Sequence, residues 1–327
     1  GVQIYLFTFY HHARTTDELR GRLRNLHIEG ANFQRPISQY NIFSKMLVIK
    51  PHRLITPLIS KIRYLSQEPS GKPNPHPNVD QREVDHLGKM AEEWWNPTGP
   101  MKGLHSLNAL RVPLIRDGLI ATDLVPQNQI RSPQVLNGLN ILEVGCGGGI
   151  LTEALARIHA NVVGIDPGEK LINIAKEHAE RDEKISARIK YLMESVEEHA
   201  PKNVERYDAV VASEVLEHVN DKPAFLEHCI MALKPGGSIF ITTQNKTTAS
   251  WLGGIVAAEY ILKLVPENTH DWDKFIDPLD LQRILKTFNC TTVLVHGMSY
   301  EFWRNRWSWC KRMDICYALQ AVKLVDN

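Results

Sequence analysis

Cysteine is scarce in this chain, and the cysteines it has are not grouped. Five occur in 327 residues, and no two of them form a CxxC pair. An odd number of widely separated cysteines argues against a disulfide framework, and the lack of CxxC argues against a thiolate zinc site. The composition therefore indicates a reducing compartment.

Long apolar runs are also missing, and so is a large net charge. Without a long apolar core near the start, the sequence does not predict a secretory signal. The formal net charge is +1, but residues 1–78 carry eleven Lys or Arg against four acids, and residues 79–327 carry 27 against 33. An acidic body is a poor match for a phosphate backbone, which argues against nucleic acid as a partner.

The first 78 residues have the composition of a targeting segment. They are rich in arginine and poor in acids, and they run into PSGKPNPHP at residues 69–77. That stretch has too much proline for regular structure. The composition predicts a transit peptide and disordered linker over residues 1–78, followed by one folded domain over residues 79–327. A disordered basic tail is the alternative reading.

One glycine is missing from the turn after the strongest apolar run. Residues 140–149 read NILEVGCGGG, so Gly145 and Gly147 are followed by Ile150 where a GxGxxG motif has its third glycine. Without that third glycine, the helix cannot pack closely on the strand, as it does in sites that bind a diphosphate. A second apolar run ends in Asp166, where a carboxylate can bind a ribose diol. The pattern predicts a nucleoside cofactor without a diphosphate, although a tight turn with no ligand also uses glycine.

From residue 79 on, short β-branched runs alternate with helical stretches. The runs lie at residues 141–144, 162–165, 189–193, 208–212 and 238–243. This alternation predicts a doubly wound α/β fold with a parallel sheet. Two later runs, residues 292–297 and 316–322, have no crossover helix between them and predict an antiparallel hairpin that closes the sheet.

Ten short motifs then occur in one order along residues 79–298. They are VDQREVD (79–85), EWWN (93–96), LHSLNALR (104–111), EVGCGGG (143–149), EVLEHV (214–219), LKPGG (233–237), SWL (250–252), AEYIL (258–262), THD (269–271) and FI (275–276). By these motifs the chain resembles the ubiquinone-biosynthesis O-methyltransferases, a family of class I S-adenosylmethionine-dependent methyltransferases. The glycine and LKPGG motifs indicate only a methyltransferase, whereas the paired tryptophans and the insertion after Thr243 are specific to this family.

The resemblance implies a fold, an activity and a location. The fold is a Rossmann-like, seven-stranded mixed sheet with helices on both faces, plus an amphipathic helix inserted within residues 245–269. The activity is methylation of catechol-type hydroxyls on polyprenylated benzenoids, namely 3,4-dihydroxy-5-polyprenylbenzoate and 3-demethylubiquinol. The location is the matrix side of the mitochondrial inner membrane, where the enzyme is peripheral and meets the lipid surface and other enzymes of a coenzyme Q biosynthetic complex.

Four residues are expected to bind S-adenosylmethionine by this resemblance. They are Arg111, Gly145, Asp166 and Ser213. A guanidinium can pair bidentately with the carboxylate of the cofactor, and an acid can accept from both ribose hydroxyls. Ser213 ends the fourth strand and is expected to face the cleft. Glu143 is expected to orient the amino group of the cofactor or a water.

Catalysis is expected at Glu214, Glu217 and His218. If a helix begins after the fourth strand, these three side chains share one face of it. Two carboxylates and an imidazole could hold Mg²⁺, or Zn²⁺ as the alternative metal, and His270 is the candidate fourth ligand. The alternative is His218 as a general base without a metal, because a phenol with a pKa near 10 must lose its proton.

Two further segments suggest contact with a lipid surface. Helical spacing in residues 251–265 puts apolar side chains on one face, in a stretch too short to span a bilayer. An ordinary lid over the sheet is the alternative. Residues 302–312, FWRNRWSWCKR, are rich in Trp and Arg, which fits either a second interfacial anchor or buried tryptophans.

Three other functions compete with this interpretation. One is a methyltransferase for another small phenol or acid, and another is a lipid-binding scaffold subunit that has lost catalysis. The presence of Gly145, Asp166 and the Glu214, Glu217, His218 set argues against the scaffold. An RNA methyltransferase is disfavoured by the acidic body and by the missing basic aromatic platform.

Overall fold

A computed structural model describes residues 78–247 and 274–325 of the chain. The chain divides into two units, Gly1–Pro73 and Asn74–Asn327, and all described residues belong to the second. Two predicted features therefore lie outside the described residues: nearly all of the leader over residues 1–78, and the inserted helix over residues 251–265. Within the described ranges, no helix has both the length and the apolar character needed to cross a bilayer.

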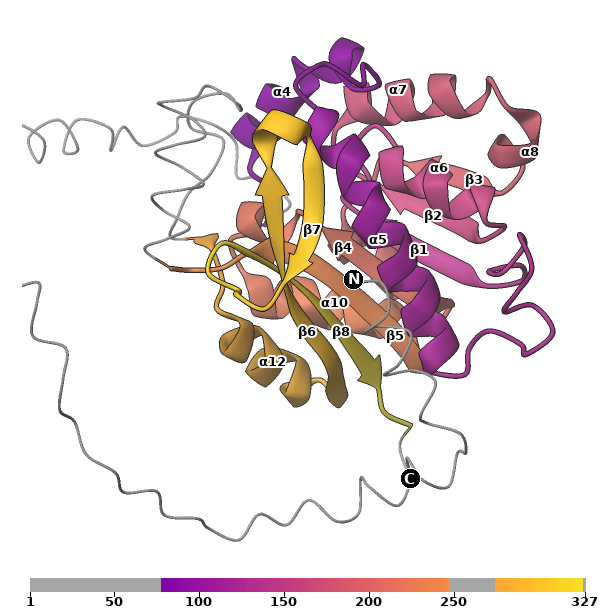
Figure 1. Cartoon of the computed structure of the whole chain (residues 1–327), viewed down its shortest axis with the longest axis vertical. Helices are drawn as coiled ribbons and strands as arrows, with labels where there is room; N and C mark the ends of the chain where they lie inside the picture. Colours follow the sequence, from indigo (N-terminus) through magenta and orange to yellow (C-terminus); the bar gives the residue numbers. More distant parts are fainter. Residues whose placement is uncertain (1–77, 248–273, 326–327) are drawn as a thin grey trace, which may run out of the picture. The chain divides into compact units, whose positions relative to one another are not determined.

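An eight-stranded mixed sheet forms the centre of this second unit (Figure 1). The strand order is β3-β2-β1-β4-β5-β8-β6-β7. Neighbours among the first five run parallel, and the last three join antiparallel. The strands are β1 (Asn140–Val144), β2 (Asn161–Ile165), β3 (Ile189–Leu192), β4 (Tyr207–Ser213), β5 (Leu233–Gln244), β6 (Cys290–Glu301), β7 (Arg306–Cys310) and β8 (Cys316–Lys323). The order reverses between β1 and β4, so a crevice is expected at the carboxyl ends of these strands.

Helices cover both faces of the sheet. The α-helices are α4 (Gln81–Gly88), α5 (Lys102–Ala121), α6 (Ile150–Arg157), α7 (Glu169–Ala179), α8 (Glu183–Ser186), α9 (Val196–His199), α10 (Lys222–Ala232) and α12 (Pro278–Thr287). Short 3₁₀ helices are η1 (Ala91–Glu93), η2 (Ala200–Lys202), η3 (Leu216–His218) and η6 (Phe302–Arg304). α10 and α12 each begin after an Asp N-cap, Asp221 and Asp277, with proline in the first turn.

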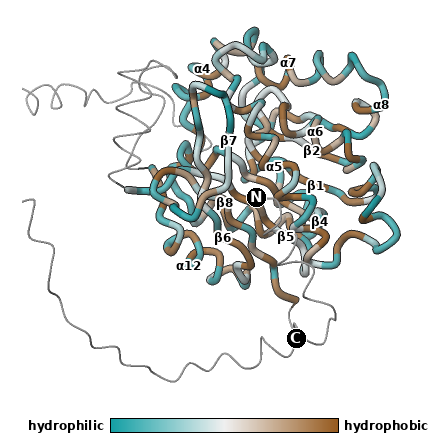
Figure 2. Tube along the Cα trace, viewed as in Figure 1, coloured by the Kyte–Doolittle hydropathy of each residue, from teal (hydrophilic) through white to brown (hydrophobic). Residues whose placement is uncertain are grey.

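The two apolar layers follow from the alternation of side chains along the strands. In β1, Ile141 packs in one cluster with α5 and α6, and its neighbour Leu142 packs in the other with α10 and α12. Ala209 and Val210 of β4 divide in the same way. Both faces are buried, so most residues of the central strands β1, β2 and β4 are apolar (Figure 2). The predicted α/β fold is confirmed.

The strand count differs from the prediction of seven. The extra strand is β7, which comes from the Trp- and Arg-rich segment and pairs with β6 as a hairpin. Residues 292–297 and 316–322 are neighbours and antiparallel, as expected, in β6 and β8. Trp307 and Trp309 of β7 are half-buried and pack on the α5 side, whereas Trp303 before it is 68% exposed.

Candidate functional site

The glycine turn connects β1 to α6 through left-handed backbone. Gly145, Gly147 and Gly149 have φ values of +69°, +53° and +88°, a region that side chains with a Cβ rarely adopt. A Cβ at Gly147 would lie 2.6 Å from Trp94. The turn thus needs glycine for its conformation and for the close approach of a ring.

The paired tryptophans clamp this turn. Trp94 is 5% exposed and lies against Gly147 and Gly148. Trp95 donates from Nε1 to the carbonyl of Gly148 at 2.9 Å and stacks on His178, with ring centroids 3.4 Å apart. The WW motif therefore has a structural role, because it fixes the backbone of the turn.

Asp166 lies directly after β2 and is tied to the same turn. Its Oδ2 accepts from the Gly147 amide at 3.0 Å, and its Oδ1 accepts from the Gly168 amide at 2.7 Å. Burial raises its pKa to about 6, against the effect of the two amide donors. These donors use part of the acceptor capacity of a carboxylate, so lone pairs remain for ribose hydroxyls.

Arg111 reaches the end of β4 from α5. It is 5% exposed, and its hydrogen bonds go to neutral groups: the Asn108 amide oxygen, the Leu104 carbonyl and Ser213 Oγ at 3.1 Å. Burial lowers its pKa, although the charges of Glu143 and Glu214 oppose this. A buried cation bonded only to neutral partners is suited to binding a carboxylate from a ligand.

Glu143 of β1 is buried beside the turn. It accepts a hydrogen bond from Thr152 Oγ1 of α6. Burial raises its pKa to about 7, and the Thr152 hydroxyl and the Arg111 charge only partly offset the effect. The group is therefore poised between its charged and neutral forms in the absence of a ligand.

The predicted helix carrying Glu214, Glu217 and His218 is wrong. Glu214 has φ +57°, and only Leu216–His218 form a single 3₁₀ turn. The chain leaves β4 too sharply for an α-helix, because the Glu214 amide still donates to Thr242 of β5 at 2.8 Å. The three side chains nevertheless line one cavity.

Each of these side chains has a protein partner. Glu214 accepts from the Thr242 hydroxyl, and Glu217 accepts from the Thr243 hydroxyl, each at 2.8 Å. Burial and then the nearby charge of Glu217 raise the pKa of Glu214 to about 7. Burial works against the charged form of His218, but a carboxylate partner and Glu217 outweigh it, so the pKa of His218 is raised.

That carboxylate partner is Glu83 on α4, which sequence reasoning missed. Its Oε2 lies 2.6 Å from His218 Nδ1, and its Oε1 accepts from Lys274 Nζ at 2.8 Å. Lys274 also lies 3.7 Å from Asp80, the N-cap of α4. The motif over residues 79–85 contained the signal, but a contact across 135 residues cannot be read from a single sequence.

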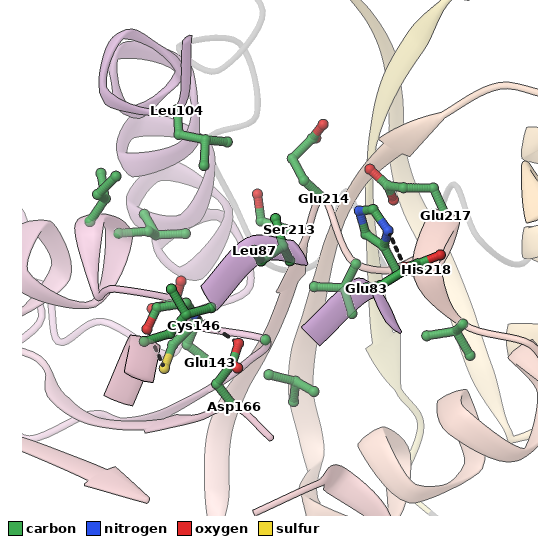
Figure 3. A pocket seen from close by; sticks show the side chains of 18 of the residues that line it. Glu83, Leu87, Leu104, Glu143, Cys146, Asp166, Ser213, Glu214, Glu217 and His218 are labelled. Atoms are coloured by element: carbon green, nitrogen blue, oxygen red, sulfur yellow. Dashed lines mark hydrogen bonds and ion pairs between the residues drawn. The ribbon is translucent and has the colours of Figure 1, made fainter. Parts of the chain in front are cut away.

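All of the predicted residues with described side chains border one cavity of about 650 Å³. Figure 3 shows Glu143, Cys146 and Asp166 at one end and the Glu83–His218 pair with Glu217 at the other. Apolar side chains from α4 and the residues after it, from the start of α5 and from the β6–β7 hairpin form much of the remaining wall. Among them are Val84, Leu87, Met90, Met101, Leu104, Tyr300, Phe302 and Trp307. The cavity joins a cofactor-type end to an end with acid–base groups.

The expected metal site is not assembled in this structure. Among residues 78–247 and 274–325, no three His, Cys, Asp or Glu side chains are placed to hold a metal ion together. His270, the candidate fourth ligand, lies outside the described residues. As arranged, Glu214, Glu217 and His218 are directed to protein partners and do not fit a metal ion.

Comparison with known proteins gives consistent matches. Residues 131–295 match a family model described as a methyltransferase domain. The chain is 45% identical over 245 residues to the rat "Ubiquinone biosynthesis O-methyltransferase, mitochondrial", covering 75% of this chain and 70% of the relative. The human protein of the same name is 46% identical, and the match covers 65% of its length, just under two thirds. A Bradyrhizobium "Ubiquinone biosynthesis O-methyltransferase" is 37% identical over 261 residues, 80% of this chain and all of the relative.

A solved structure supports the fold. The magnesium protoporphyrin IX methyltransferase of Synechocystis PCC 6803 with bound S-adenosylmethionine aligns with a TM-score of 0.50 and 17% identity. The alignment covers 76% of this chain and 99% of that one.

Proposed function

Because this chain belongs to the ubiquinone biosynthesis O-methyltransferases and is an S-adenosylmethionine-dependent enzyme, we propose that it methylates catechol-type hydroxyls of polyprenylated benzenoids. The proposed acceptors are 3,4-dihydroxy-5-polyprenylbenzoate and 3-demethylubiquinol. The observation that carries the proposal is the single cavity that connects Asp166 and the glycine turn with His218 and has an apolar wall between α4 and the β6–β7 hairpin.

At the cofactor end, the chain offers groups for the ribose and the amino-acid carboxylate of S-adenosylmethionine, which supplies an electrophilic methyl group when bound. Asp166 is held by two amides and would accept from the ribose hydroxyls. Arg111, bonded only to neutral groups, would pair with the amino-acid carboxylate. Gly145 lets the turn pack against Val215, where an added Cβ would lie 2.6 Å from the valine side chain, and Ser213 accepts a hydrogen bond from Arg111.

At the other end, His218 would take the phenolic proton. A phenol has a pKa near 10 in water, so at neutral pH a base must remove its proton as the oxygen attacks. His218 is the imidazole that lines this part of the cavity, and Glu217 is close enough to raise its pKa. Glu217 and Glu214 would orient the acceptor hydroxyls.

The resemblance also implies Mg²⁺ or Zn²⁺ at Glu214, Glu217 and His218, and this stays a prediction. The arrangement of the three side chains does not fit an ion, so no step is derived through one. Exhaustive chelation tests whether the reaction needs a metal ion. Turnover and cofactor affinity are both measured before and after the chelator is added. Lost turnover that added Mg²⁺ or Zn²⁺ restores, with cofactor affinity intact, would establish a metal-dependent reaction. Unchanged turnover would leave His218 as a plain base, and His218→Ala should then lower the rate by about 10²- to 10⁴-fold.

The acceptor is best tested with labelled S-adenosylmethionine. We expect methyl transfer to a short-tailed polyprenyl catechol at a much higher kcat/KM than to the same catechol without a tail, because the apolar wall would bind the tail. Equal kcat/KM for both would favour a methyltransferase of another small phenol. Cofactor binding without transfer to either would favour the non-catalytic lipid-binding scaffold.

Location and partners are part of the same proposal. The names of the rat and human relatives include "mitochondrial", which together with the basic composition of residues 1–78 supports a mitochondrial enzyme. A peripheral position on the matrix side of the inner membrane, next to other enzymes of coenzyme Q synthesis, would bring the cavity to a lipid-borne substrate. Deleting residues 1–73 should then abolish import into isolated mitochondria, and import of the shortened chain would contradict this.

A further inference from the structure

One buried amide borders the cavity and has no donor from the protein. Gln244 is the last residue of β5, it is 7% exposed, and it lines the cavity. Among the described residues, none donates a hydrogen bond to its buried Oε1. A buried amide oxygen without a donor destabilises a fold, and such groups are rare. Gln244 is therefore a group that the fold alone does not explain.

The surroundings of Gln244 on the sheet are apolar. It lies opposite Cys316 of β8, which in turn lies opposite Met298 of β6. Residues directly opposite each other in antiparallel strands share a face, and all three side chains border the cavity. A glutamine thus occupies one position in a row whose other two members are a cysteine and a methionine.

The same face of β5 leads back to the cofactor end. Side chains alternate along a strand, so Thr242 and Gln244 point to the same face. The hydroxyls of Thr242 and Ser213 lie 2.7 Å apart, and Ser213 accepts from Arg111. Because Thr242 pairs with Ser213, the last residue of β4, Gln244 extends beyond the end of that strand. It lies past the group expected to bind the carboxylate of the cofactor.

We propose that Gln244 is a specificity-determining residue, whose amide oxygen accepts a hydrogen bond from the catechol hydroxyl that is not methylated. This inference rests on the proposed methylation of catechols. The reacting hydroxyl loses its proton, whereas its neighbour keeps its own and needs an acceptor. Glu214 and Glu217 each already accept from a threonine hydroxyl. No described hydrogen bond holds the Gln244 amide, so a turn about its soft terminal torsion can bring Oε1 to the ligand.

The test is a double-mutant cycle between enzyme and acceptor. Wild type and Gln244→Leu are each assayed with a short-tailed polyprenyl catechol and with the monophenol that keeps only the reacting hydroxyl. The wild type should prefer the catechol about 10- to 100-fold in kcat/KM, because the monophenol leaves Oε1 unpaired. Gln244→Leu should reduce this preference at least about fivefold, and a smaller reduction would overturn the proposal. Differences in the intrinsic reactivity of the two phenols are the same for both enzymes and cancel.

Two further variants serve as controls. Gln127→Leu changes an exposed glutamine in the loop after α5, away from the cavity lining, and should keep the wild-type preference. Gln244→Glu retains an acceptor oxygen and should keep the preference as well. If Gln244→Glu loses it, the amide donates to the acceptor, contrary to the proposal.

Stability and binding separate this role from a structural one. Because Oε1 has no donor among the described residues, Gln244→Leu and Gln244→Met should melt no lower than the wild type. A clear loss in both variants would mean that the amide serves the fold, and would overturn the proposal.

Calorimetry reads the same recognition without turnover. The enzyme is saturated with S-adenosylhomocysteine, the cofactor without its methyl group, and the two phenols are titrated into it. The wild type should bind the catechol more tightly, and Gln244→Leu should lose most of that difference. If this holds but the wild type methylates neither phenol, the proposed function fails and the recognition by Gln244 stands. Equal Kd values for both phenols in the wild type would refute the recognition.

Discussion

Asp166 serves two purposes with one carboxylate: it accepts from two backbone amides and borders the cavity. Its loss should therefore affect both the ligand and the turn. We expect Asp166→Ala to weaken S-adenosylmethionine binding by about 1 to 3 kcal/mol, the cost of losing a charged hydrogen-bond partner. Calorimetry on the folded variant measures this.

A control separates the two effects. Asp166→Asn keeps one acceptor oxygen for the amides, so it should preserve the melting temperature better than Asp166→Ala. It should still weaken the binding of S-adenosylmethionine. If both variants bind S-adenosylmethionine as the wild type does, the ribose lies elsewhere.

Glu143 should make the stability of the cofactor-free protein depend on pH. Its pKa is about 7 in the folded chain against an ordinary value of 4.5, so between these values the folded state binds a proton that the unfolded state has released. Stability must therefore fall as the pH rises from about 4.5 to about 7. Glu143→Gln removes this contribution, and its stability relative to the wild type should increase over that window by about 1 to 3 kcal/mol.

Denaturant unfolding at several pH values checks the sign. Asp166 and Glu214 also have raised pKa values, so the wild-type curve contains their effects too. Only the difference between wild type and Glu143→Gln isolates Glu143. Parallel curves would show that this carboxyl does not titrate in the window.

At the scale of elements, the glycine turn and the tryptophans after η1 form one packed unit. Gly147→Ala must place a Cβ 2.6 Å from Trp94 at φ +53°. We expect a loss of about 2 to 5 kcal/mol, the sum of left-handed strain and overpacking. Gly138→Ala is a matched control, because its φ is +89° but no atom lies within 4 Å of the added Cβ. It should cost only about 1 to 2 kcal/mol.

Chemical denaturation of both variants gives the comparison. A Gly147→Ala loss no larger than that of Gly138→Ala would mean that Trp94 moves aside at little cost. In that case the clamp would not be rigid.

Which elements could be predicted depends on how local their signal is. The parallel strands β1, β2 and β4 are buried on both faces, so they appear in sequence as apolar runs, and the residues after them could be placed in one cleft. β7 is an edge strand whose tryptophans alternate with Arg306 and Ser308, which also fits a surface anchor. Its pairing with β6 was therefore not predicted.

The sequence predicts the wrong backbone conformation after β4 for a related reason. Spacing alone suggested a helix for Glu214, Glu217 and His218, but a hydrogen bond to β5 holds Glu214 in left-handed backbone. Tertiary contacts override local periodicity there. The partner of His218 comes from α4, far away in sequence, so only the fold reveals it.

For the whole molecule, the boundary between leader and body matters most. The sequence suggested that residue 78 belongs to the linker, yet Asn78 is 8% exposed and donates to Glu197 at 3.0 Å. Its side-chain oxygen also accepts from the Asp221 amide, at the N-cap of α10, at 2.7 Å. Asn78 therefore binds to the folded body.

A pair of truncations tests this boundary. A chain beginning at Asn74 should retain in vitro activity and the full melting temperature. A chain beginning at Val79 should lose about 1 to 3 kcal/mol, because the Asp221 amide and Glu197 lose a buried partner. Equal stability by denaturant unfolding would show that water replaces Asn78 without cost.

The position of β8 determines the order in which the sheet can be completed during synthesis. β8 is the last described strand in the chain, yet it lies between β5 and β6. A ribosome therefore releases the whole parallel half first, with the edge of β5 unpaired, and the β6–β7 hairpin has no place in the sheet until residues 316–323 emerge. Uncovered strand edges invite wrong pairing between chains. The protein is thus most exposed to aggregation while β8 has not yet paired with β5 and β6, and this is the interval in which chaperones should bind it.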